Sequence, residues 1–134
     1  MSPVVHFEMP ANDRERMANF YTKAFGWKTQ LLGEEMGNYV LAATTETDEH
    51  GMIQTPGVIN GGFFPKSDEM PAQYPSVVIA VDDIHEAMND IKNAGGEVIG
   101  EPMDIPGVGP YVSFYDTEGN RVSIMQPIQP MPGK

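Results

Sequence analysis

The chain has 134 residues and no cysteine, and its 19 acidic and 8 basic residues give a formal net charge of −11 at pH 7. The length allows one domain with a substantial core, and the acidic balance argues against a nucleic-acid-binding surface, which needs clustered Lys and Arg. The absence of cysteine excludes disulfides and thiolate ligands. The sequence has no apolar run of about 18 residues and no N-terminal signal pattern, so we expect a cytoplasmic protein that does not bind membranes.

The first predicted strand ends at Pro10 and has two unlike faces. Val5 and Phe7 alternate with His6 and Glu8, which is the period-two pattern of a strand. Because a buried unpaired charge loses its solvation, we expect His6 and Glu8 to face away from the helix that follows. Their side chains should then lie next to each other, as a pair suited to acid–base chemistry.

The helix that follows is predicted to start at Asn12. Asn12 and Glu15 have the spacing of a capping box, and Gly26 stands where a left-handed residue would end the helix. Five residues at helical spacing form the face that is expected to pack: Met17, Phe20, Tyr21, Ala24 and Phe25.

Strand, turn and helix signals then repeat. Three more strands are predicted at residues 27–32, 38–45 and 58–64, with glycines at 61 and 62 that indicate a bulge or a close backbone approach. After a segment with three prolines at 65–75, a strand is predicted at 76–81, followed by a helix that starts after its cap Asp83 and ends at the glycines 95 and 96. Three strands follow at residues 97–100, 111–115 and 121–126, with a loop at 102–110.

The two halves are therefore similar units. The sequence GNYV at residues 37–40 matches GPYV at 109–112, and each half is too small to be stable alone. We predict a single α+β domain over residues 1–134, built from two βαβββ modules. Module one is expected at about 4–65, module two at about 75–127, and a tail at 128–134.

Several segments together resemble a known family. They are HFEMPANDRERMANFYTKAFGW at 6–27, IAVDD at 79–83, AGG at 94–96, IPGVG at 105–109 and FYDTEGN at 114–120. Over residues 4–127 the chain resembles the vicinal oxygen chelate superfamily, which holds glyoxalase I, bleomycin resistance proteins and extradiol dioxygenases. It looks most like the single-domain, glyoxalase-like branch related to lactoylglutathione lyase. The resemblance implies a cupped, barrel-like sheet with a site in its concavity, and a homodimer.

The resemblance also places the metal-ligand positions of the family. Metal-using members carry His, Glu or Gln on the first and fourth strands of each module. At these positions this chain has His6, Ser76, Ser123 and either Asn60 or, if the strand bulges, another residue within 60–62. Serine hydroxyls and an amide are poor ligands for a divalent ion. We therefore expect no cofactor and no tightly held metal, with a weak divalent site at His6 and Glu8 as an alternative.

The predicted catalytic residues are His6 and Glu8. A small-molecule ligand is expected to contact strand residues around them: Tyr39, Asn60, Ser76, Tyr111, Ser113, Ser123 and Met125. Three functions stay open. The first is a lyase-like enzyme or binder for a small oxygenated molecule, with most metal ligands lost. The second is a non-catalytic protein that sequesters a drug or metabolite, and the third is a divalent-metal-dependent lyase or dioxygenase.

Overall fold

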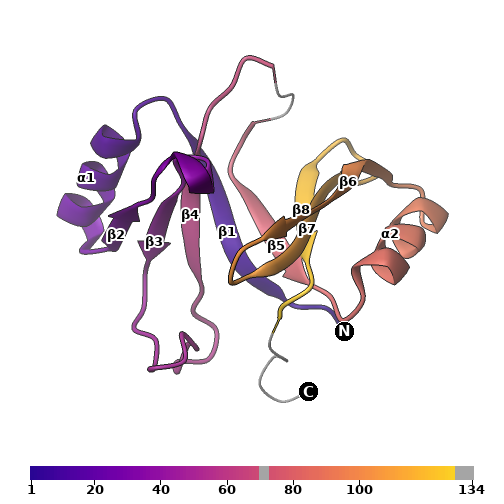
Figure 1. The fold of residues 1–134 in the computed structure, drawn as a ribbon, viewed down its shortest axis with the longest axis horizontal. Coiled ribbons are helices and arrows are strands. Elements are labelled where there is room, and N and C mark those ends of the chain that lie inside the picture. The colour runs from indigo at the N-terminus through magenta and orange to yellow at the C-terminus, as the bar shows by residue number, and fades with distance from the viewer. Residues whose placement is uncertain (70–72, 129–134) are drawn as a thin grey trace. The chain divides into compact units, whose positions relative to one another are not determined.

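The computed structural model describes residues 1–69 and 73–128, in two compact units. We call residues 6–75 the first module, and residues 1–5 together with 76–134 the second module (Figure 1). Part of the predicted linker, residues 70–72, and the predicted tail from residue 129 onward lie outside the described residues. No helix in the described part of the chain has the length and apolar character needed to cross a membrane.

The first module contains a helix and a sheet with strand order β2-β3-β4-β1 (Figure 1). Strand β1 pairs with β4 in parallel, and the other neighbours pair antiparallel. Its elements are β1 (Val4–Ala11), α1 (Arg14–Phe25), β2 (Lys28–Leu31), the short 3₁₀ helix η1 (Glu34–Met36), β3 (Val40–Ala43) and β4 (Asn60–Pro65). Val4 and Val5, the first two residues of β1, belong to the second module.

The second module repeats this arrangement with strand order β5-β8-β7-β6. Strand β5 pairs with β8 in parallel, and the other neighbours are antiparallel. Its elements are β5 (Ser76–Ala80), α2 (Ile84–Asn93), β6 (Glu97–Ile105), β7 (Gly109–Tyr115) and β8 (Arg121–Met125). The α+β class and the two βαβββ modules predicted from the sequence are thus confirmed.

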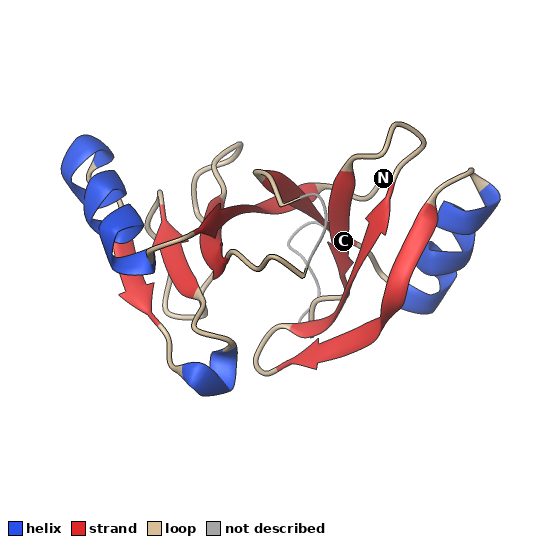
Figure 2. Cartoon of the chain, turned by 90° about the horizontal axis from the view of Figure 1, so that it is seen from above, coloured by secondary structure: helices blue, strands red, loops and turns tan. Residues whose placement is uncertain are grey.

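In each module the helix covers one face of the sheet (Figure 2). Apolar side chains of the helix and the sheet form a separate core in each module. The removal of these side chains from water is the main favourable term for folding each layer. The first core consists of Ala11, Ala18, Val40, Ala42 and Phe63, and the second of Val81, Ile84, Met88, Val112, Phe114 and Ile124.

Helix α1 begins one residue later than predicted. Asp13, not Asn12, is the N-cap, and its carboxylate accepts a hydrogen bond of 3.0 Å from the backbone N–H of Arg16. The reason is that β1 continues through Pro10 to Ala11, which leaves Asp13 as the last extended residue before the helix. The predicted ends at the other positions are confirmed: Gly26 is left-handed with φ of 73°, and Asp83 caps α2.

The predicted packing face of α1 is only partly correct. Ala18 is buried, and Met17 and Tyr21 pack against the core beside it. Three residues of the predicted face are instead exposed: Phe20, Ala24 and Phe25. The small Ala18 brings the helix close to the sheet, so the contact stripe is centred there. The exposed rings pack on neighbouring aromatic side chains, as in the edge-on contact of Phe20 with Tyr21, whose ring centroids lie 5.0 Å apart.

The loop predicted at residues 102–110 is mostly strand. Strand β6 runs on to Ile105 and β7 starts at Gly109, with an irregular register between Ile99 and Met103. Gly100, at φ of 77°, lies in this bulge, which accommodates the extra residues. Strand β6 is the edge strand of its module, where proline is tolerated. Glycine and proline here mark a bulge and a tight turn rather than a long loop.

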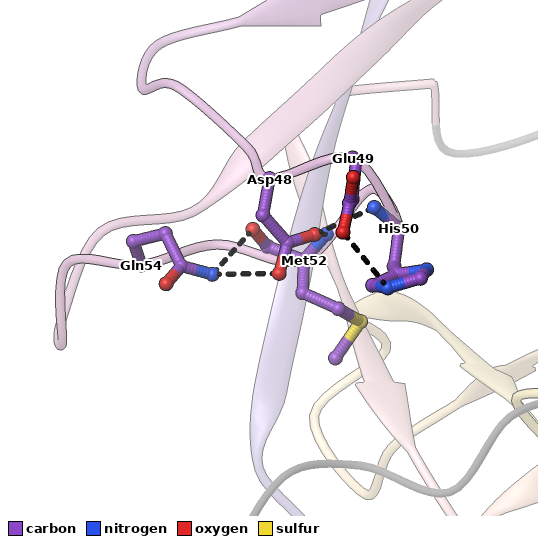
Figure 3. Close-up of polar contacts among 5 residues, drawn as sticks. All are labelled: Asp48, Glu49, His50, Met52 and Gln54. Carbon is purple, nitrogen blue, oxygen red and sulfur yellow. Dashed lines mark hydrogen bonds and ion pairs between the residues drawn. The ribbon is translucent and has the colours of Figure 1, made fainter.

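The polar loop between β3 and β4 is organised by Asp48 (Figure 3). Its carboxylate accepts hydrogen bonds from the backbone N–H groups of Met52 and His50 and from the Gln54 amide, at 2.8–3.0 Å. These bonds, led by that from Met52, hold the pKa of Asp48 below its usual value. The His50 ring contacts Glu49 at 3.5 Å and is exposed, so we assign it no part in the site below.

Candidate functional site

The phenol of Tyr39 connects His6 and Glu8. The Tyr39 hydroxyl lies 3.0 Å from Nε2 of His6 and donates a hydrogen bond of 3.0 Å to Oε2 of Glu8. His6 and Glu8 are on β1, and Tyr39 directly precedes β3. Phe7, between them, packs against the core. The two predicted residues therefore share the face of β1 that is turned away from the core, and the sequence-predicted ligand contact Tyr39 joins them.

Two glycines of β4 make this arrangement possible. Strand β4 lies between β3 and β1 (Figure 1), with Gly62 opposite Glu8 and Gly61 opposite Phe7. A Cβ atom on Gly62 would overlap the Tyr39 ring, and one on Gly61 would overlap the Phe7 ring. Tyr39 thus crosses β4 directly over Gly62. The close approach predicted from these glycines is confirmed, one ring on each face.

Arg14 holds the chain just before Tyr39. Its guanidinium donates to the carbonyl oxygens of Leu32 and Asn38, on the two sides of the short helix η1. Asn38 is the one non-glycine residue with positive φ in the described part of the chain, at 55°. Sequence reasoning missed Arg14, because a cation in the first turn of a helix carries no signal of a contact 18 to 24 residues away.

Burial and charge act in opposite directions on His6. Burial lowers its pKa below the usual 6.5, and the negative charge of nearby Glu8 offsets part of this effect. Glu8 itself is buried, with 8% of its surface exposed. The hydrogen-bond directions also set the proton on the imidazole. The phenol of Tyr39 has one O–H and donates it to Glu8, so the hydrogen bond with His6 must be donated by Nε2. In the neutral ring, Nδ1 is then the basic nitrogen.

Asn60 has a structural task that the sequence did not reveal. Its side-chain oxygen accepts hydrogen bonds from the backbone N–H groups of Thr44 and Thr45, at 2.7 and 3.0 Å. These bonds tie the start of the long loop to the start of β4. They also engage the amide oxygen of a residue that was predicted from the sequence to bind a ligand.

The second module holds a cluster of hydroxyl groups. The Tyr111 hydroxyl lies 2.7 Å from Oγ of Ser123, and Oγ of Ser113 lies 2.9 Å from the same atom. Arg121, which sequence reasoning missed, donates to Ser113 at 3.5 Å. Ser113 and Ser123 are buried. Of the other predicted contacts, Ser76 begins β5 and Met125 pairs with Tyr111, and both are half-buried.

The donor atoms do not suit a divalent ion. No three His, Asp or Glu side chains gather among residues 1–69 and 73–128 in a way that could hold a metal. The Glu8 carboxylate accepts from Tyr39, the Asn60 oxygen accepts from two backbone groups, and the Ser123 hydroxyl bonds to two other hydroxyls. The residues at the family's ligand positions therefore do not fit the metal that the resemblance associates with them, and we derive no step through one.

Residues 4–124 match the profile of the glyoxalase/bleomycin resistance protein/dioxygenase superfamily. The chain belongs to this superfamily. A glyoxylase-like domain-containing protein of Didymella fabae is 32% identical to it over 120 residues, which cover 87% of this chain and 88% of that protein. A probable lactoylglutathione lyase of Vibrio cholerae is 27% identical over 125 residues, covering 92% and 89% of the two chains.

Other superfamily relatives are longer or more distant. The anthracycline biosynthesis protein DnrV of Streptomyces peucetius is 31% identical over 120 residues, which are 84% of this chain but 42% of that protein. A variant of Streptomyces coelicolor methylmalonyl-CoA epimerase, in complex with 2-nitronate-propionyl-CoA, superposes with a TM-score of 0.70 at 15% identity over 96% of this chain and 99% of that one. At this identity the epimerase shows the shared fold alone. The family resemblance seen in the sequence is confirmed by the profile match over residues 4–124.

Proposed function

We propose that the protein is an enzyme that moves a proton on a small oxygenated molecule, with His6 as the base. The observation that supports this is the single phenol shared by His6 and Glu8. A buried carboxylate joined through a hydroxyl to an imidazole orients the imidazole and favours its charged form after it takes a proton.

The proposed step uses Nδ1 of His6. This nitrogen takes a proton from a carbon next to a carbonyl group, and the electron pair of the broken C–H bond moves to the carbonyl oxygen as an enolate. Glu8 stabilises the imidazolium through Tyr39. Return of the proton to a different atom gives an isomerisation, and expulsion of a leaving group gives a lyase reaction. The lowered pKa keeps His6 unprotonated, and so able to act, near neutral pH.

Relatives supply the compounds to test. One relative is named as a probable lactoylglutathione lyase and another for anthracycline biosynthesis, so the panel should contain S-lactoylglutathione and anthracyclines. Exchange of substrate hydrogen for deuterium in D₂O, followed by NMR, detects the proton step even without net turnover. We expect His6→Gln to reduce exchange on the order of 10²–10⁴-fold, the usual contribution of a general base.

The control for this test is His85→Gln, which alters an exposed histidine on α2. It should exchange at the wild-type rate. Wild-type activity of His6→Gln would contradict the proposed role of His6, and an absence of exchange for every compound in the panel would contradict the proposed reaction class.

A second candidate function is sequestration of a cationic ligand. The net charge of −11 favours this, because a negative surface attracts cations and excludes anions. Titration with bleomycin or an anthracycline, followed by Trp27 fluorescence, would show tight binding that weakens with salt. Binding without any chemical change in the ligand would favour sequestration over the enzymatic proposal.

We also propose that the protein is a homodimer, which the superfamily resemblance implies. The edge strands of the two modules, β2 and β6, each carry backbone groups on one side that a second copy could cover. Sedimentation at micromolar concentration should give twice the chain mass of 14.7 kDa. A single species at the chain mass would reject the dimer.

A further inference from the structure

We propose that Gly62 is the positioning residue of the candidate site: its missing side chain lets the Tyr39 phenol cross β4 and fix His6 as the Nε2–H tautomer. The tautomer is a property of the resting protein. It can therefore be measured whether or not any substrate turns over, and only its use in proton transfer rests on the proposed function.

Gly62 leaves the space that the Tyr39 ring occupies. Tyr39 starts beside β3, while both of its partners lie on β1, with β4 between them. Gly62 is buried, and a Cβ atom there would overlap both the ring and the hydroxyl of Tyr39. A methyl group at this position would therefore displace the phenol from its path. The hydroxyl could not stay 3.0 Å from both His6 and Glu8.

The second module shows what happens when this position has a side chain. Strand registers make Gly62 and Ser123 equivalent: Gly62 precedes Phe63, the partner of Val40, and Ser123 precedes Ile124, the partner of Val112. Tyr111 precedes Val112 just as Tyr39 precedes Val40. The Tyr111 hydroxyl contacts Oγ of Ser123 at 2.7 Å. A serine at this position engages the tyrosine, whereas glycine lets it reach the next strand.

The hydrogen bonds of the Tyr39 phenol select the tautomer of His6. A neutral imidazole in water holds its proton on either nitrogen, and a specific hydrogen bond at one nitrogen selects the tautomer. Here the phenol donates its one O–H hydrogen bond to Glu8, so toward His6 its oxygen can only accept one. The phenol position therefore decides that Nε2 carries the proton and Nδ1 is basic. Removal of the phenol leaves this choice to solvent.

The experiment is ¹⁵N NMR of the full chain with labelled histidine, above the pKa of His6. The exposed His85 serves as the internal reference for a mixed population of tautomers. We expect wild-type His6 to be the Nε2–H form. Gly62→Ala and Tyr39→Phe should both shift His6 toward the mixed population. A wild-type Nδ1–H form, or an unchanged tautomer in either variant, would overturn the proposal.

Gly61→Ala is the matched control. It adds the same methyl group to the same strand, but against Phe7 on the opposite face. It should lower stability and leave the His6 tautomer in place, which a general disturbance of β4 would not.

A second measurement covers the case in which Gly62→Ala does not fold. Adding Tyr39→Ala removes the obstructing ring, so Gly62→Ala/Tyr39→Ala should be more stable than Gly62→Ala alone in denaturant unfolding. A double variant no more stable than the single one would overturn the link between Gly62 and Tyr39. A failed search for substrate would leave the result standing, because neither measurement uses a ligand.

Discussion

His6 and Asn60 are register partners across β1 and β4, yet their side chains serve different ends. The His6 imidazole joins the phenol of Tyr39, whereas the Asn60 amide oxygen accepts two backbone hydrogen bonds from the loop that enters β4. One residue of this pair thus belongs to the candidate site and the other supports the backbone beside it. Their substitutions should have different consequences.

Asn60→Ala should lower the free energy of unfolding by about 1–3 kcal/mol, because two partly buried backbone N–H groups would lose their acceptor. Urea denaturation measures this loss. Asn60→Asp keeps an acceptor oxygen and should lose less. Equal stability of Asn60→Ala and the wild type would show that water satisfies the two donors and would leave the amide available to a ligand.

Glu8→Gln should lower the pKa of His6 further. The negative charge of Glu8 now raises that pKa against the effect of burial, so removing the charge leaves burial unopposed. A histidine NMR titration of wild type and variant gives the comparison. A raised pKa in Glu8→Gln would mean that the carboxylate and imidazole do not interact as the geometry indicates. Glu118→Gln, in an exposed turn of the second module, is the control and should leave the titration of His6 unchanged.

His6 should make the folded protein less stable in mild acid. Its pKa is lower in the folded chain than in the unfolded chain, so the unfolded chain binds the proton first as the pH falls. The contribution of neutral His6 is complete above the unfolded value of about 6.5 and is lost as the pH falls from there toward the lower folded pKa. His6→Asn should therefore flatten the dependence of unfolding free energy on pH between about 7.5 and 5.5. In the control, His85→Asn, the wild-type dependence should remain.

The N-cap of α1 can be tested by a pair of neighbouring substitutions. Asp13→Ala should cost about 1 kcal/mol of stability, because the carboxylate that accepts from the Arg16 N–H is lost. Asn12→Ala, one residue earlier and exposed, should be close to neutral. Thermal unfolding of both variants compares the two stability losses. A larger loss for Asn12→Ala would show that Asn12 is the N-cap, as the sequence pattern predicted.

The βαβββ repeat, the superfamily and the shared face of His6 and Glu8 could all be inferred from the amino-acid sequence alone. These follow from local periodicity and from short motifs, which depend on residues close together along the chain. The alternation from Val5 to Glu8 needs only the pleat of one strand. Gly61 and Gly62 likewise predicted either a bulge or a close approach, because glycine inside a strand is otherwise unfavourable.

The contacts that His6 and Glu8 make depend on the folded chain. Tyr39 is more than 30 residues from His6 and Glu8 along the chain. Gly62, on β4, leaves room for its ring. The N-cap of α1 depended on where β1 ended. The exposure of Phe20 and Phe25 depended on the helix packing on the sheet through Ala18. Such contacts arise from the register between strands and from side-chain volume across the core. Neither is encoded in the spacing of residues along one segment.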